Sequence, residues 1–248
     1  MRIIATRPSL KNAHISIIIV GNDARKLVAD GFPLEQVVTS DLRQGEHFAL
    51  GLTSGLIDLI AVLHLPELAD LGHKLFRTTQ ETYPIAFVPG DVFDPKHLEV
   101  VPPLASAHAA STGSPENPTQ DLCSLTSLNP LHGRVSAIHA SSFFDLFGEE
   151  KQLHLARALA GLLSAEPGSM ICGLHVGSPV KGFTLCPAHR DHDLFCHSPE
   201  SWTKLWDGLV FEKGAVTVQA KLVKEEHKEP DAPQSTVLNM LVWTVTRL

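Results

Sequence analysis

Short apolar runs, most of them rich in β-branched residues, alternate along this chain with segments of helical periodicity. The runs are ISIIIV (residues 15–20), QVVTS (36–40), PIAFVP (84–89), RVSAIHASSFFDLF (134–147) and SMICGLHVG (169–177). Runs of this length are typical of buried strands, and strands that alternate with helices favour a mostly parallel sheet in an α/β fold. The alternation therefore predicts strands whose carboxyl ends meet at one edge of the sheet.

Helix signals separate these runs. The predicted helices span residues 24–31, 67–79, 121–128, 149–164 and 199–206. The fourth has the clearest periodicity and is expected to end at Pro167 and Gly168, while the fifth begins with Ser198 as N-cap and Pro199 at the first helical position. Each helix is therefore expected to follow a strand and return the chain to the sheet.

The pattern changes near the carboxyl terminus. TVQAKLVKEEH (217–227) and STVLNMLVWTVTRL (235–248) are β-rich runs joined by a polar turn, and they suit an antiparallel hairpin that closes the sheet edge. Alternating βα units followed by such a hairpin favour a Rossmann-like class I methyltransferase sheet over a dehydrogenase sheet, whose sixth strand is parallel. The predicted fold class is thus α/β, mostly parallel, with a carboxyl-terminal antiparallel hairpin.

Two carboxylates stand at the predicted carboxyl edge. Asp41 follows the second run directly, and Asp91 comes shortly after the third. In a doubly wound sheet, ligands bind outside the strand ends, where an acid can accept hydrogen bonds from ribose hydroxyls or an adenine amino group. Asp41 also lies twenty residues after Gly21, the spacing between a glycine turn and a ribose-binding acid. The pair predicts a nucleoside site, although each aspartate alone would suit a solvated loop.

Composition excludes several other partners. The chain has 248 residues, 44% of them hydrophobic, and a net charge of -7, so one domain over residues 1–248 is expected, with no nucleic acid or membrane as principal partner. Four scattered cysteines are too few for a disulfide scaffold and fit a reducing compartment. The amino terminus lacks a signal-peptide pattern, so a cytoplasmic location is expected.

Several ordered blocks carry a family resemblance. They are ARKLVADG, SDLRQ, DLGHKLFR, GDVFD, LNPLHGRVSAIHASSFF, EPGSMICGLHVG, FCHSPESWTKLWDG and LVWTVTRL. Together they resemble the fungal secondary-metabolite S-adenosylmethionine-dependent methyltransferases, a group that includes carboxyl O-methyltransferases of meroterpenoid pathways. The resemblance implies a class I methyltransferase fold, S-adenosyl-L-methionine as cofactor and a small apolar molecule as methyl acceptor, and it leaves a homodimer open.

The resemblance also implies a set of cofactor-binding positions. These are Gly21 and Asp23 on the methionine side, Asp41 and Leu42 at the ribose, Asp91 and Val92 at the adenine, and His139, Ala140 and Ser141 beside the sulfonium and the acceptor. Independently of the resemblance, the strand pattern also places an acid after the second strand, Asp41, and after the third, Asp91. Both lines of reasoning therefore lead to the same edge of the sheet.

Two stretches depart from the family pattern. The first strand lacks the family's acid and keeps only Gly21 of its glycine loop, and the helices that precede this strand in the family are absent. Residues 45–66 are interposed where the family runs almost directly into a helix. We expect residues 45–66 and the atypical amino terminus to be a translated intron or a misassigned start, and residues 102–120, rich in Pro, Ser and Ala, to be a flexible loop.

The chemistry that the resemblance implies demands little of the protein. Methyl transfer from a sulfonium is an in-line displacement, so holding the acceptor oxygen close and aligned is the main requirement. A carboxylate acceptor is already ionised near neutral pH, whereas a phenol or alcohol benefits from a general base. His139 is the candidate base, with a hydrogen bond to the backbone as its structural alternative.

Two further groups of residues bear on the site and the core. A zinc site could in principle involve Cys186, His189, His192, Cys196 and His197, but their spacing is not a common zinc pattern, so no metal and a flexible loop beside the substrate pocket are predicted. Five aromatic residues are predicted to lie in the core, namely Phe143, Phe144, Phe147, Trp202 and Trp206. Phe183 and Phe195 are predicted to offer an apolar surface to the acceptor.

Three classes of function follow from these patterns. The first is an O-methyltransferase acting on a carboxylate or hydroxyl of a small secondary metabolite. The second is a nicotinamide-dependent oxidoreductase, which the missing G-x-G-x-x-G argues against. The third is a non-catalytic, methyltransferase-like protein that no longer binds the cofactor, which the reduced glycine loop favours.

Overall fold

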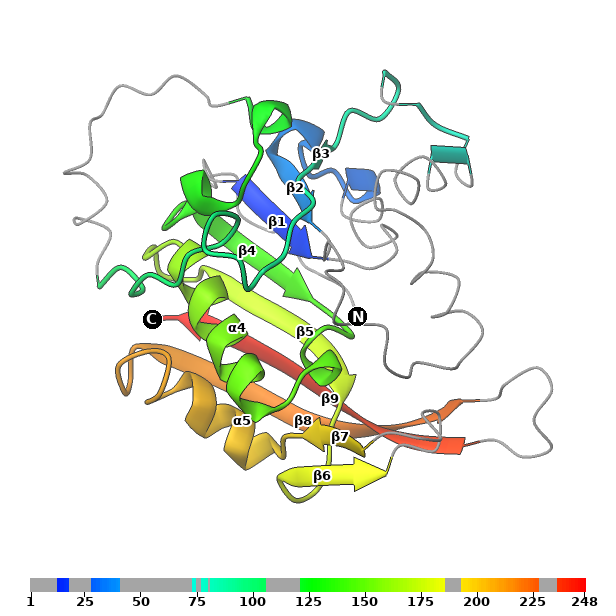
Figure 1. The fold of residues 1–248 in the computed structure, drawn as a ribbon, viewed down its shortest axis with the longest axis vertical. Coiled ribbons are helices and arrows are strands. Elements are labelled where there is room, and N and C mark those ends of the chain that lie inside the picture. The colour runs from blue at the N-terminus through cyan, green and yellow to red at the C-terminus, as the bar shows by residue number, and fades with distance from the viewer. Residues whose placement is uncertain are drawn as a thin grey trace.

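The apolar runs form the strands of one mixed sheet, drawn in Figure 1. The computed structural model describes residues 13–17, 28–40, 73–74, 77–79, 81–105, 121–185, 193–227 and 236–248. Within them the strand order is β3-β2-β1-β4-β5-β9-β8. The strands are β1 (Ala13–Ile17), β2 (Val37–Ser40), β3 (Ala86–Phe87), β4 (Val135–Ala140), β5 (Met170–Val176), β8 (Val216–His227) and β9 (Thr236–Arg247).

Strand direction divides this sheet into two parts. Strands β1 to β5 pair in parallel, whereas β9 runs antiparallel to both β5 and β8. Parallel strands buried on their faces suit the β-branched runs, and a long hairpin needs only a short polar turn. The predicted sheet, mostly parallel with a carboxyl-terminal antiparallel hairpin, is therefore confirmed in the described residues.

Helices α4 (Glu149–Leu162) and α5 (Pro199–Trp206) cover one face of this sheet, as Figure 1 shows. Alternate residues of the strands point toward this face: on β5, Ile171 and His175 are buried, and on β9, Trp243 and Val245 are buried. The core therefore lies between the two helices and strands β4, β5 and β9. Single 3-10 turns lie at Leu34–Gln36 (η1), Leu122–Ser124 (η4), Asn129–Leu131 (η5) and Phe144–Leu146 (η6).

The start of α5 follows the predicted capping pattern. Ser198 accepts a hydrogen bond from the backbone nitrogen of Ser201, and the hydroxyl of Ser201 accepts one from the backbone nitrogen of Ser198. Pro199 occupies the first turn, where its missing N–H leaves no bond unmade. This reciprocal cap fixes where the chain turns from the short strand Asp193–Cys196 (β7) into the helix that covers β8.

Some predicted boundaries were wrong. The run 84–89 contributes only two residues to β3, because Pro84 and Pro89 lack the backbone N–H that a longer strand would need. Helix α4 ends at Leu162, within two residues of its predicted end at Ser164, and Ser164 donates its backbone N–H to the carbonyl of Val135 in β4. The predicted helix at 121–128 contains a single 3-10 turn, Leu122–Ser124, and a second 3-10 turn follows at Asn129–Leu131.

The segment between β5 and α5 also differs from its prediction as a flexible loop. Residues Gly182–Leu185 (β6) and Asp193–Cys196 (β7) pair as a separate two-stranded antiparallel sheet. The pairing satisfies backbone groups that a loop would leave to water. The prediction was therefore wrong for these eight paired residues, whereas the tip of the hairpin lies outside the described residues.

Other predictions fall mainly on parts of the chain that the structure does not describe. They concern the proposed insert at 45–66, most of the expected loop at 102–120, the end of the first run at 18–20 and most of the helices at 24–31 and 67–79. The ends of both helices are described: the chain turns at Gly31 with φ of 100° and at Arg77 with φ of 52°. These predictions otherwise stay untested.

Close packing of β4 against β5 depends on Gly173, which suggests the first prediction. A Cβ at this position would lie 2.0 Å from the carbonyl oxygen of Ala140, so Gly173→Ala should reduce the free energy of unfolding by at least about 2 kcal/mol. Gly148→Ala is the control, since a Cβ there has no neighbour within 4 Å and the change should cost no more than about 1 kcal/mol. Urea denaturation measures both, and equal losses would contradict the close approach.

Candidate active site

Strand β1 lies at the point where the direction of chain progression reverses. It pairs with β2 on one side and β4 on the other, and Ile17 is level with both Ser40 and Ala140. Neighbouring strands lie about 4.8 Å apart, so the ends of β2 and β4 stand roughly 10 Å from each other across β1. A crevice outside such a reversal point is where open α/β sheets bind their ligands. We call this region the carboxyl edge.

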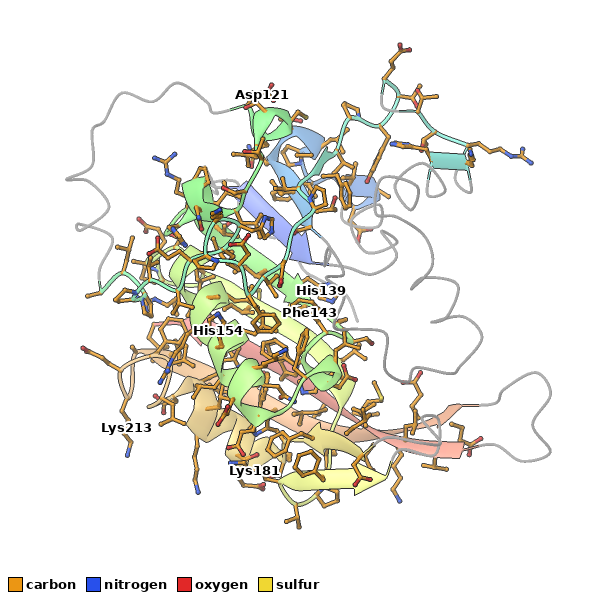
Figure 2. All side chains as sticks on the ribbon, in the orientation of Figure 1. Asp121, His139, Phe143, His154, Lys181 and Lys213 are labelled. Atoms are coloured by element: carbon orange, nitrogen blue, oxygen red, sulfur yellow. The ribbon has the colours of Figure 1, made fainter. Side chains whose placement is uncertain are left out.

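At the end of β4, a histidine and a serine are joined. The hydroxyl of Ser141 and Nε2 of His139 form a hydrogen bond of 2.7 Å, because residues two apart on a strand share a face. Figure 2 shows His139 at the tip of β4. The backbone then leaves the strand at Ser142, which adopts φ of 48° and donates its N–H to the carbonyl of Leu174 at 2.7 Å. The pair is thus held directly before a left-handed turn.

At the end of β3, a second turn presents Asp91. Its Oδ1 accepts a hydrogen bond from the backbone nitrogen of Phe93 at 2.9 Å, which fixes the carboxylate, while Oδ2 has no partner among the described residues. Gly90 precedes it against the ring of His97, where a Cβ would lie 2.1 Å from Nδ1. Burial lowers the pKa of His97, opposed by the charges of Asp94 and Asp91. The turn leaves one carboxylate oxygen able to accept a hydrogen bond from a ligand.

The structure places the predicted site residues as follows. Gly21, Asp23, Asp41 and Leu42 lie outside the described residues. Among the rest, Asp91 lies at the carboxyl edge after β3, and His139, Ala140 and Ser141 lie at the end of β4. Val92 is 1% exposed and Ala140 is 0% exposed. These two side chains therefore belong to the core, and only their backbone atoms could contact a cofactor.

The aromatic predictions have different outcomes. Five aromatic residues are buried as predicted, namely Phe143, Phe144, Phe147, Trp202 and Trp206. Phe183 is 70% exposed on β6, but Phe195 is 6% exposed and packs against Phe183 with ring centroids 5.4 Å apart. Phe195 was therefore wrongly predicted as an open acceptor surface, because pairing of β6 with β7 covers its ring.

The metal prediction concerns residues that are only partly described. Cys186, His189 and His192 lie outside the described residues, whereas Cys196 and His197 are buried at the end of β7. No group of three or more potential ligands is arranged to hold a metal in the described part of the chain. His197 instead shares a hydrogen bond of 2.8 Å between its Nδ1 and the hydroxyl of Ser201.

Asp145 is a functional candidate that the sequence reading missed. Its Oδ2 accepts a hydrogen bond from the backbone nitrogen of Val176 at 3.0 Å, and its Oδ1 is buried without a partner among the described residues. Burial raises the pKa of this carboxyl to about 6, opposed by hydrogen bonds from the backbone of Val176 and of Asp145 itself. The signal in the sequence was an acid flanked by Phe144 and Leu146 in an otherwise apolar stretch.

Two histidines lie under α5 without charge. Burial lowers the pKa of His175 to about 3, with a smaller contribution from His197. Burial likewise lowers the pKa of His197 to about 4. The charge of Lys181 lowers this pKa as well, whereas the charge of Glu149 raises it. The indole nitrogen of Trp243 donates to Nδ1 of His175 at 3.0 Å, so the neutral ring carries its proton on Nε2. These imidazoles are parts of the core.

A groove of about 660 Å³ lies beside this core, between the starts of α4 and α5. Its lining includes Leu153, Leu205 and Leu209, and the ion pair between Lys181 and Glu149, with Nζ and Oε1 2.5 Å apart, also borders it. The described residues that line it come from α4, from α5, from the segments next to α5 and, for Lys181, from the segment before β6, and none of them belongs to β2, β3 or β4. It is therefore distinct from the crevice at the carboxyl edge.

Comparison with known proteins agrees with this geometry. No family model matches the chain. It is 27% identical to the O-methyltransferase phiE of Fungal sp. over 231 residues, which cover 92% of this chain and 60% of that protein. It is 25% identical over 196 residues to the asnovolin E/chermesin D methyltransferase nvfJ of Aspergillus novofumigatus, covering 79% of this chain and 51% of that protein.

A third curated relative aligns with a shorter part of this chain. The methyltransferase ausD of Penicillium brasilianum is 31% identical over 101 residues, covering 41% of this chain and 34% of that protein. The curated relatives of this chain are thus fungal methyltransferases, and the resemblance drawn from the sequence blocks is confirmed. The chain spans about half the length of these relatives, with 60%, 51% and 34% covered.

The fold also matches a solved structure. A protein studied for the conversion of a disulfide bond into a thioacetal group during echinomycin biosynthesis superposes with a TM-score of 0.50. The match covers 96% of this chain and 75% of that protein at 13% identity, so it bears on the fold alone. None of the helices in the described ranges has the length and apolar character to cross a bilayer.

The buried histidines lead to a prediction about pH. An unfolded histidine takes up a proton near pH 6.5, whereas buried His175 stays neutral down to about pH 3, so the unfolded chain binds more protons between these values. Stability should therefore fall as the pH falls below 6.5. When the pH falls from 7 to 5, the free energy of unfolding of the native protein should decrease by about 2 kcal/mol more than that of His175→Gln. The amide oxygen of this glutamine can still accept a hydrogen bond from Trp243.

Urea denaturation at the two pH values measures this difference. The raised pKa of Asp145 acts in the opposite direction, because its carboxyl is easier to bury once protonated below pH 6. That contribution is common to the native protein and His175→Gln, so it cancels when the two are compared. Parallel pH profiles for the two proteins would show that His175 is not a buried neutral base.

Proposed function

We propose that this chain is an S-adenosylmethionine-dependent methyltransferase that transfers a methyl group to an oxygen of a small apolar metabolite. The observation that carries the proposal is the β3-β2-β1-β4-β5-β9-β8 sheet, whose carboxyl edge bears Asp91 and the His139–Ser141 pair. The named activities of the fungal relatives support it. The acceptor oxygen is proposed to belong to a carboxylate or a hydroxyl, in a cytoplasmic protein that acts alone or as a homodimer.

The described residues fit such a cofactor. Oδ2 of Asp91, for which the described residues offer no hydrogen-bond partner, can accept a hydrogen bond from an adenine amino group, while Oδ1 accepts from Phe93 and holds the carboxylate in place. The His139–Ser141 pair lies at the end of β4, and strands β2 and β1 separate it from the end of β3. A nucleoside bound after β3 would therefore extend across β1 toward the end of β4. When bound, S-adenosylmethionine would supply a methyl group whose carbon is attacked by the acceptor oxygen, in line with the departing sulfur.

The protein's own part is to orient the acceptor and to manage its proton. His139 is half-buried, and its Nε2 is held at 2.7 Å from the hydroxyl of Ser141. A hydroxyl acceptor entering at this edge could replace Ser141 as donor to Nε2 and lose its proton to the imidazole. A carboxylate acceptor would need no proton transfer, and alignment alone would serve it.

The first test is binding of S-adenosylhomocysteine, measured by calorimetry. The native protein should bind it, and Asp91→Ala should weaken the affinity about 10- to 100-fold, because a charged hydrogen bond to the nucleoside is lost. Asp94→Ala is a matched control: Oδ1 of Asp94 also accepts a backbone hydrogen bond, from Lys96 at 2.9 Å, but this exposed side chain lies in the following turn. Its affinity should remain that of the native protein.

The same titrations separate the alternative functions. Heat from a nicotinamide dinucleotide, and none from S-adenosylhomocysteine, would support an oxidoreductase. Heat from neither would support the non-catalytic protein that the reduced glycine loop around Gly21 suggested. Equal losses in Asp91→Ala and Asp94→Ala would indicate that the turn, rather than the carboxylate, matters.

The second test assigns the role of His139. With methyl-labelled cofactor and a panel of benzoates and phenols, His139→Ala should lower kcat about 100-fold for phenols and change it little for benzoates. A carboxylate carries no proton to remove, so it is the internal control. Unchanged turnover of phenols would exclude His139 as a general base.

A further inference from the structure

A second carboxylate, that of Asp145, lies outside the predicted nucleoside site and accepts a hydrogen bond from the backbone nitrogen of Val176. We propose that Asp145 is a positioning residue that holds the turn after β4 against the end of β5 and thereby sets the His139–Ser141 hydrogen bond. This inference rests on the proposed function, since the edge it shapes is the one assigned to cofactor and acceptor. Asp145 itself touches neither.

The first step concerns how the strands separate. The paired register of β4 and β5 extends to His139 opposite Cys172. Beyond this point, two hydrogen bonds connect the segment after β4 with the end of β5. Ser142 donates its N–H to the carbonyl of Leu174 at 2.7 Å, and Val176 donates its N–H to Oδ2 of Asp145 at 3.0 Å. The carboxylate therefore takes the place that a strand carbonyl would occupy.

The second step concerns the strain in the turn. Ser142 adopts φ of 48°, a left-handed conformation that disfavours residues with a side chain. Such a conformation persists only when the surrounding contacts determine it. The bond of Ser142 to Leu174 fixes one end of the turn, and the bond of Asp145 to Val176 fixes the other. Ser141 lies directly before this turn, so its hydroxyl depends on both anchors.

The side-chain oxygen of Asp145 is the acceptor that anchors this turn to Val176. A charged acceptor makes a stronger bond to a backbone N–H than a neutral one, which can hold a strained turn. Oδ1 of Asp145 is nevertheless buried without a partner in the described part of the chain, a cost to stability. Burial accordingly raises the pKa of the carboxyl to about 6. A carboxylate such as Asp145, which costs stability and lies beside the carboxyl edge, is better explained by a role in positioning the turn after β4 than by a role in stabilising the fold.

The test uses the nitrogen resonances of His139 in protein labelled with ¹⁵N-histidine. Ser141→Ala provides the reference spectrum for a broken His139–Ser141 bond. Asp145→Ala should shift the Nε2 resonance of His139 to that reference position, whereas Asp145→Asn, whose amide oxygen can still accept from Val176, should leave it at the native position. If Asp145→Ala fails to fold, Asp145→Ser replaces it, because the shorter hydroxyl cannot reach Val176.

Asp207 offers a matched control. Its Oδ1 also accepts a backbone N–H, from Gly214 at 2.7 Å, but at the far end of α5. Asp207→Ala should destabilise the protein without moving the His139 resonance. A native His139 resonance in Asp145→Ala, even with a lowered Tm, would overturn the inference and leave Asp145 as a cap of β5 only.

Calorimetry adds a functional readout. Asp145→Ala should weaken S-adenosylhomocysteine binding about tenfold, while Asp145→Asn should bind within about threefold of the native protein. If the native protein gives no binding heat, the proposed function fails, yet the His139 resonance still decides whether Asp145 positions the pair. Native affinity in Asp145→Ala would contradict any influence of Asp145 on the cofactor site.

Discussion

The indole ring of Trp202 joins the helical layer to the sheet, and much of the described structure depends on its contacts. From α5 it reaches Phe144 at 4.9 Å, His175 at 4.8 Å and Trp243 at 5.0 Å between ring centroids. These partners come from the turn after β4, from β5 and from β9. The contacts with Phe144 and His175 are edge-to-face and the contact with Trp243 is tilted. Such aromatic pairs favour defined ring orientations, so this cluster fixes three elements relative to α5. A smaller side chain in place of Trp202 would loosen them together.

The carboxyl edge inherits its geometry from this cluster. Phe144 is fully buried in it, while its neighbours in sequence, Phe143 and Asp145, begin and continue the turn that carries the chain from β4 to α4. The His139–Ser141 pair is therefore only a few residues from the best-packed part of the molecule. Residues placed on rigid elements can hold a reacting group more accurately than residues on an open loop, and an in-line methyl transfer depends mainly on such alignment.

Local signals in the sequence predicted local structure well. Ser198 and Pro199 announced the start of α5, and the two carboxyl-terminal β-rich runs announced the antiparallel hairpin of β8 and β9. What failed depended on contacts between distant segments. Strand β6 pairs with β7 inside a segment predicted to be a loop. The hydrophobic periodicity of a short stretch of sequence carries no information about contacts with distant residues.

The site residues could likewise be predicted where local sequence signals place them, but not where their role depends on a contact with a distant residue. Asp91 follows β3 and His139 lies at the end of β4, so their place at the carboxyl edge could be read from strand ends alone. The part of the prediction that concerns Gly21 and Asp41 stays untested. Asp145 could not be assigned in this way, because its role exists only once Val176 is brought beside it. The two described carboxylates also show why residue type is insufficient. Asp91 keeps one oxygen available outside the turn that holds it, whereas Asp145 has both oxygens enclosed and a raised pKa. Environment thus separates a residue suited to bind a ligand from one suited to hold the backbone around it.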